Sequence, residues 1–106
     1  MAELIVVSWR DIPAQVIVRA GRRTAKRPLS GRFQEAIDRA AMRAKLRDTD
    51  AYLGEWQRIF AGGCGDDLEI EAERAAAKLE ADYPPERLRA LVANGGLEPR
   101  TQGTPA

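Results

Sequence analysis

Residues 4–19 have the sequence LIVVSWRDIPAQVIVR, in which two runs rich in β-branched residues flank a short link that contains Pro13. The first run, residues 4–9, is too short for a helix and predicts a strand. In the second run, residues 14–19, Gln15, Ile17 and Arg19 alternate with Val16 and Val18 before Gly21. The first run is apolar on both faces, so we expect it to be the more buried strand. Two such runs joined by a four-residue link predict an antiparallel β-hairpin.

An isolated hairpin is only marginally stable in water, so we expect a further strand or a helix to cover it. Residues 24–29 are a candidate third strand at the edge of the sheet. They include Lys26, Arg27 and Pro28. Charged residues and proline are typical of an edge strand that must not pair with other chains.

Four later segments carry apolar residues at intervals of three or four, which is the spacing of one helical face. The first begins after Ser30, a residue type that favours the N-cap, and its apolar stripe extends from Phe33 to Ala44. The second begins at the capping pair Asp48-Thr49 and ends at the glycine-rich residues 62–65. Its predicted inward stripe consists of Tyr52, Leu53, Trp56 and Phe60.

Two more helices are predicted in the last third of the chain. The third begins after Asp66 or Asp67, either of which can cap it, and ends at Pro84. The fourth opens with Pro85, because proline is tolerated in a first helical turn. It is closed by Asn94 and the two glycines that follow it.

These elements predict an α+β fold in which an N-terminal antiparallel β-hairpin, with or without a third edge strand, packs with three to four α-helices. A chain of 106 residues fits a single hydrophobic core, so we expect residues 1–96 to form one domain. Apolar periodicity is lost at Leu97, and residues 97–106 are predicted to be a flexible tail.

The composition and the N-terminal residues indicate the cellular compartment of the protein. No uninterrupted apolar run exceeds four residues, whereas a membrane-spanning helix needs roughly 20, and the N-terminus lacks the features of a secretory signal. The chain has one cysteine and therefore no internal disulfide, which favours a reducing compartment. We expect a cytoplasmic protein that does not contact a membrane.

The chain contains no histidine, and this restricts the chemistry it can perform. Ser-His and Cys-His nucleophile pairs, histidine-ligated zinc or haem, and the usual general base near neutral pH are all excluded. An enzyme would have to use carboxylates, lysine or arginine. The acidic pair in Asp48-Thr49-Asp50 lies where a helix cap is needed and offers too few oxygen ligands for a hard cation. No catalytic residue, metal or cofactor is therefore predicted.

Cys64 lies in a glycine-rich segment just before a predicted helix N-terminus, a place where a thiolate can be stabilised. Asp66 and Asp67 are adjacent in sequence and oppose its ionisation. The balance favours an inert cysteine over a reactive thiol. The segment lacks the lysine of a phosphate-binding loop and does not follow a predicted strand.

Basic residues are concentrated in the first half of the chain. Residues 1–47 contain 11 Lys and Arg against 4 Asp and Glu, and residues 48–106 contain 6 against 12, so the two parts carry +7 and −6. Eight of these cations form a candidate anion-binding or partner-binding set between the second strand and the end of the first helix. They are Arg22, Arg23, Lys26, Arg27, Arg32, Arg39, Arg43 and Arg47.

This basic set has two interpretations. A row of arginines along a helix suits phosphate groups, because Lys and Arg supply most of the affinity for nucleic-acid backbones. Alternatively, the set is a solvated face that docks on the acidic third helix through Glu69, Glu73 and Glu80. The second interpretation is favoured, since the net charge is only +1 and no nucleic-acid-binding motif is present.

The part of the chain between Trp9 and Trp56 resembles a bacterial family called the virulence factor domain, whose module is also similar to part of the larger conserved virulence factor C. The resemblance rests on several segments taken together: Ile12-Pro13-Ala14-Gln15-Val16, the basic residues 21–26, Arg32-Phe33, Ala36-Ile37-Asp38, Ala40-Ala41-Met42 and Thr49-Asp50-Ala51-Tyr52-Leu53. It implies no reaction, ligand or catalytic residue. It implies an association with one-carbon metabolism, through tetrahydrofolate or corrinoid methyl-transfer proteins.

The leading hypothesis from the sequence is a small accessory domain that interacts with a protein partner and has no chemistry of its own. A second is binding of nucleic acid or another anionic ligand through the basic set. A third is an enzyme subunit of one-carbon metabolism that works without histidine.

Overall fold

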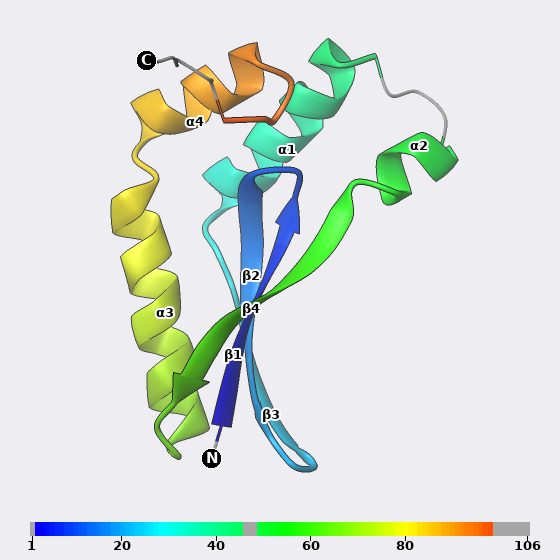
Figure 1. Cartoon of the computed structure of the whole chain (residues 1–106). Coiled ribbons are helices and arrows are strands. Elements are labelled where there is room, and N and C mark those ends of the chain that lie inside the picture. The colour runs from blue at the N-terminus through cyan, green and yellow to red at the C-terminus, as the bar shows by residue number, and fades with distance from the viewer. Residues whose placement is uncertain (1, 46–48, 99–106) are drawn as a thin grey trace, which may run out of the picture.

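The computed structural model describes residues 2–45 and 49–98 of the 106-residue chain, apart from the side chain of Thr49. It contains four strands and four helices in the order β1 (Ala2–Trp9), β2 (Ile12–Ala20), β3 (Arg23–Pro28), α1 (Gly31–Arg43), α2 (Thr49–Leu53), β4 (Trp56–Cys64), α3 (Leu68–Asp82) and α4 (Pro85–Ala93) (Figure 1). The strands form one antiparallel sheet in the order β3-β2-β1-β4. The predicted α+β class, the N-terminal hairpin and the third strand at the edge are confirmed.

The hairpin turn is tighter than predicted. Only Arg10 and Asp11 connect β1 to β2, because Ile12 and Pro13 already belong to β2. Arg10 has φ 51°, the left-handed conformation that two-residue hairpin turns require. The pairing register shifts between Val7 and Ser8, where Ser8 lies opposite Pro13. Such an irregularity is one of the few places where a strand accommodates proline.

The predicted second helix is wrong for residues 56–64. Helix α2 ends at Leu53, and the chain then enters β4, which pairs with the free edge of β1. Gly62, expected in a helix-terminating segment, lies inside β4 at φ +115°, beside a register shift that leaves Ala61 without a partner in β1. Strand pairing overrode the helical spacing because an edge of β1 needed a hydrogen-bonding partner.

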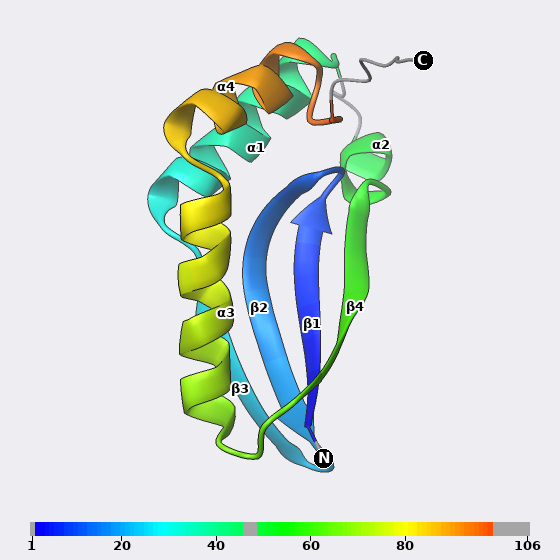
Figure 2. The same ribbon diagram turned by 60° about the vertical axis from the view of Figure 1, so that its left-hand side comes forward.

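The core has two parts. Where α3 packs on β2 and β3, Val16, Val18, Leu68 and Ala72 belong to one buried cluster. At the other end of the sheet, α1 and α4 pack against each other and enclose a cluster built around Trp9 (Figure 2). The residues of this cluster are Trp9, Ile12, Phe33, Ala36, Ile37, Ala40, Ala41, Leu88 and Leu91. The partly buried Leu29 packs against both parts. The expectation that residues 1–96 form one domain stays a prediction.

The helix boundaries mostly follow the predicted caps. Asp67 caps α3, where its Oδ1 accepts a hydrogen bond from Ile70 N at 3.2 Å. Ser30 occupies the N-cap position of α1, but its hydroxyl donates to Glu80 Oε1 at 2.9 Å and does not cap the helix. Asp48 and the side chain of Thr49 lie outside the described part, so the predicted cap of α2 stays a prediction.

The end of α4 is held against the hairpin turn. Asn94 closes α4, and the main-chain N of Glu98 donates to Asp11 Oδ2 at 2.7 Å. Of the predicted flexible tail, Leu97 and Glu98 are described, and residues 99–106 lie outside the described part. No described helix combines the length and apolar character that crossing a bilayer requires.

Candidate functional site

The fold divides the predicted basic set between separate places. Arg32, Arg39 and Arg43 reach a groove between α1 and α4. Arg22 lies in the turn between β2 and β3, and Arg47 lies outside the described residues. The other three belong to β3, where alternate residues point to opposite faces of the sheet.

The three cations of β3 do not act together. Arg27 faces α3 and pairs with Glu69, with 3.5 Å between Nη2 and Oε1. Arg23 lies near Asp67 and Glu69 at a second cavity of about 300 Å³. Lys26 pairs in register with Ile17 and lies on the sheet face opposite α3. This part of the basic set is thus partly neutralised by the acidic start of α3.

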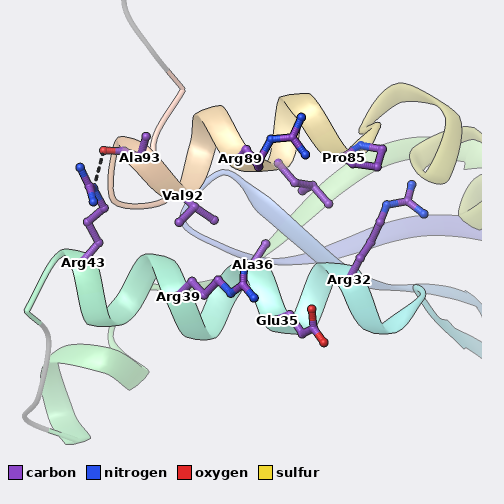
Figure 3. Close-up of a pocket in the computed structure, with 10 residues that line it drawn as sticks. Arg32, Glu35, Ala36, Arg39, Arg43, Pro85, Arg89, Val92 and Ala93 are labelled. Carbon is purple, nitrogen blue, oxygen red and sulfur yellow. Dashed lines mark hydrogen bonds between the residues drawn. The ribbon is translucent and has the colours of Figure 1, made fainter.

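The larger groove, of about 400 Å³, lies between α1 and α4 and is lined by four arginines and one glutamate around an apolar floor. Spacings of three and four residues bring its lining to one face of each helix. Figure 3 shows α1 and α4 side by side, with Arg39 and Arg43 on α1 and Arg89 on α4. The lining residues are Arg32, Glu35, Ala36, Arg39, Arg43, Pro85, Leu88, Arg89, Val92 and Ala93.

Arg32 at one end of the groove is committed to the fold. Its Nη1 pairs with Glu80 Oε1 at 2.9 Å, and its Nη2 donates to the main-chain oxygens of Glu80 at 2.8 Å and Tyr83 at 3.1 Å. The guanidinium also lies over the Phe33 ring, 4.9 Å from its centroid. These contacts tie the start of α1 to the end of α3, so Arg32 has little capacity left for a ligand.

Arg43 at the other end is partly engaged. Its Nε donates to the main-chain oxygen of Ala93 at 3.1 Å (Figure 3), which places the guanidinium at the C-terminus of α4. The carbonyl groups at a helix C-terminus carry partial negative charge and attract a cation. This bond orients Arg43 while its two terminal Nη groups have no hydrogen-bond partner within residues 2–45 and 49–98.

Arg39 and Arg89 are the available cations of the groove. Both are exposed, and neither has a hydrogen bond or an ion pair with any described residue. They face the same apolar floor from different helices, beside Ala36, Leu88 and Val92. Two unpaired guanidinium groups next to an apolar surface can bind carboxylates, each through two parallel hydrogen bonds.

The expectation that the basic residues dock on α3 holds for two pairs. Arg27 pairs with Glu69 and Arg32 pairs with Glu80. Glu73 is exposed and has no ion pair in the described part of the chain. The Arg27–Glu69 pair is largely exposed and is worth little stability, about 0–1 kcal/mol for such pairs. The Arg32–Glu80 pair, by contrast, connects the start of α1 to α3.

Cys64 is half-buried at the end of β4 rather than in a turn. Burial raises the pKa of its thiol above the ordinary value, and the negative charges of Glu71 and Asp66 raise it further. The expected suppression of ionisation is confirmed, although the sequence named only the neighbouring aspartates. Among the described residues, no cluster of three or more Cys, Asp and Glu side chains is arranged to hold a metal ion.

Arg89 and, with it, the second wall of the groove were not predicted from the sequence. The signal was present, because Pro85, Leu88, Arg89 and Val92 follow the three-or-four spacing of one helical face. What the chain order did not reveal was that α4 packs against α1, because local spacing does not specify which helices become neighbours.

Residues 7–92, more than half of the chain, match the model of a protein family described as Virulence factor. The predicted resemblance is thereby confirmed, and the match extends past β4 into α4, so that it includes both helices of the groove. The comparisons with curated proteins and with solved structures gave no match.

Proposed function

The chain belongs to the virulence factor family, and we propose that it is a protein-interaction domain whose α1–α4 groove holds an acidic segment of a partner protein. The observation that carries the proposal is the pair Arg39 and Arg89, two cations without a described partner on opposite walls of one apolar-floored groove. In this proposal the protein is an accessory domain of the cytoplasm, and the arginines bind a partner instead of performing a reaction.

The chemistry of the groove favours a polypeptide segment with both acidic and apolar side chains. Apolar side chains of the segment would lie on Pro85 and Val92, which line the groove and are not fully buried, and their burial would remove apolar surface from water. Its carboxylates would meet Arg39 and Arg89. Because guanidinium groups are weakly hydrated and match the geometry of carboxylates, they are the cations best suited to such an interface.

Nucleic acid is supported less well. Binding to a phosphate backbone depends on several cations acting along one surface, but the groove arginines and the β3 cations occupy different places, and Arg27 and Arg32 already pair with glutamates. The association with one-carbon metabolism remains an expectation from the family resemblance. A ligand that binds the native state selectively raises the melting temperature. A rise with a tetrahydrofolate or a corrinoid would therefore support the association with one-carbon metabolism.

The test measures binding of labelled synthetic peptides by fluorescence anisotropy. The first probe is an amphipathic peptide composed of Glu and Leu residues. The second is the same peptide with every Glu replaced by Gln, and the third is a single-stranded DNA oligonucleotide. We expect the acidic peptide to bind, and we expect Arg39→Glu with Arg89→Glu to weaken it at least about tenfold, equivalent to ~1.4 kcal/mol. Binding should also weaken as salt rises, because rim charges are screened.

The matched control reverses two cations outside the groove, Arg22→Glu with Lys26→Glu. This double variant makes the same change in net charge, so it separates the groove from a general charge effect. Equal weakening in both double variants would contradict the proposal. Stronger binding to the oligonucleotide than to the acidic peptide would favour the nucleic-acid alternative.

A further inference from the structure

The two edges of the sheet differ in how they are protected against pairing with other chains. The β3 edge carries Lys26, Arg27 and Pro28, which are residues that discourage strand addition. The β4 edge has only one charged residue, Arg58, among its nine residues. An edge strand with so few charges and no proline is a template for further strand pairing.

Strand β4 also exposes large apolar side chains on both of its faces. Ile59 is 45% exposed and Phe60 is 63% exposed, and adjacent residues of a strand point to opposite sides of the sheet. Leu53, which ends α2 just before β4, is exposed as well. Three of the six exposed large hydrophobic side chains in the described part of the chain thus lie within residues 53–60.

The positions of the helices explain this exposure. Helix α3 packs on β2 and β3, and α1 contacts β2, so the described helices cover the half of the sheet away from β4. Figure 2 shows β4 on the side of the sheet opposite α3. No described strand pairs with its outer edge.

We propose that β4 is a homodimer interface, at which two copies of this chain pair their β4 strands antiparallel about a two-fold axis to form an eight-stranded sheet. A two-fold axis makes the same strand its own partner, which is the commonest arrangement of homo-oligomers. The net charge of +1 produces little repulsion between copies. Burial of Ile59 and Phe60 provides the apolar contact that the isolated chain lacks.

The position of Arg58 disfavours one register and supports another. An axis at Arg58 would place the two Arg58 side chains opposite each other, and directly opposed like charges are destabilising. An axis at Ile59 places Ile59 opposite its own copy and Arg58 opposite Phe60 of the second copy. A guanidinium over an aromatic ring is a favourable contact. The unpaired Ala61 ends the regular part of β4, so the side chains of residues 58–60 form the centre of the interface.

The first experiment is light scattering or sedimentation equilibrium on the full chain over a concentration series that reaches the millimolar range. We expect a dimer that dissociates on dilution and that Ile59→Lys converts to a monomer. Ile70→Lys is the matched control, because Ile70 on α3 is equally exposed, at 44%, but lies away from β4. A monomeric wild-type chain, or a dimer that survives Ile59→Lys, would overturn the proposal. Circular dichroism verifies that both variants fold.

The second experiment tests the register by disulfide formation in a Cys64→Ser background. Directly opposite residues in an antiparallel pair have Cβ atoms about 4.5–5.5 Å apart, close to the separation that a disulfide spans. Ile59→Cys should therefore oxidise to a covalent dimer faster than Gln57→Cys, whose copies would lie on opposite sides of the axis. Equal rates at the two positions would contradict the register, and no cross-linking at either would contradict the interface.

Discussion

Gly96 lies where the end of α4 meets the indole of Trp9, and replacing it with alanine should destabilise the fold strongly. Its φ is +93°, and a Cβ there would be 2.7 Å from Trp9 Cζ3 and 3.2 Å from Cε3. The indole cannot move aside easily, because it is fully buried and its Nε1 donates to the main-chain oxygen of Tyr52 at 3.0 Å. The glycine is held too, since Asp11 N donates to Gly96 O at 2.8 Å.

Two costs contribute to the expected loss. A side chain in the left-handed region costs about 1–2 kcal/mol, and forcing an extra methyl group into a packed core costs about 1–3 kcal/mol. Gly96→Ala should therefore lower the free energy of unfolding by roughly 2–5 kcal/mol. Gly21→Ala is the control, because Gly21 has φ +61° but open space around the added Cβ. It should cost only the backbone part, about 1–2 kcal/mol.

Urea unfolding followed by tryptophan fluorescence and by far-ultraviolet circular dichroism measures both variants. Because a whole domain is stable by only ~5–15 kcal/mol, the midpoint of Gly96→Ala should fall well below that of Gly21→Ala. Coincident midpoints for the two variants would refute the reasoning, since they would show that the Trp9 indole does not oppose a side chain at residue 96.

Three further outcomes are expected. Glu80→Gln should lower the free energy of unfolding by about 1–3 kcal/mol in urea, because it removes the charged partner of Arg32; a loss unchanged in the Arg32→Ala background would show that the pair is not its source. Asp67→Ala should cost about 1 kcal/mol in the same assay through loss of the α3 cap, and an unchanged midpoint would exclude that role. Cys64 should react with iodoacetamide more slowly in the folded chain than in guanidinium at the same pH, because its raised pKa leaves less thiolate. The folded-state rate should rise with pH and in Glu71→Gln, and a rate independent of both would contradict the electrostatic cause.

The elements that the sequence predicted well are those with a strong local signal. The proline that opens α4 and the cap at Asp67 each act on residues within a few positions along the chain. Hydrogen bonding and side-chain direction within one element follow from such short-range patterns. The same holds for the apolar stripes of α1 and α3, which face the interior as predicted. The expectation that the first strand is more buried than the second is wrong, because Val16, Ile17 and Val18 of β2 are all buried.

Strand β4 shows where local spacing fails. Tyr52, Trp56 and Phe60 are four residues apart, which fits a helix, yet Tyr52 and Trp56 pack around Trp9 while Phe60 faces solvent from a strand. Residues 56–64 form a strand because they pair with the second edge of β1. A partner about 50 residues away leaves no trace in the periodicity of the segment itself.

The candidate site divides in the same way. The arginines of α1 could be assigned to one helical face from their spacing, because the geometry of a helix relates residues three and four apart. Their different roles depend on residues of two later helices. Glu80 of α3 engages Arg32, and Ala93 of α4 orients Arg43. Arg39 stays available and lies across the groove from Arg89 of α4. Local order along the chain specifies which side chains share a face, whereas the packing of distant elements specifies which of their charges are neutralised and which stay free to bind.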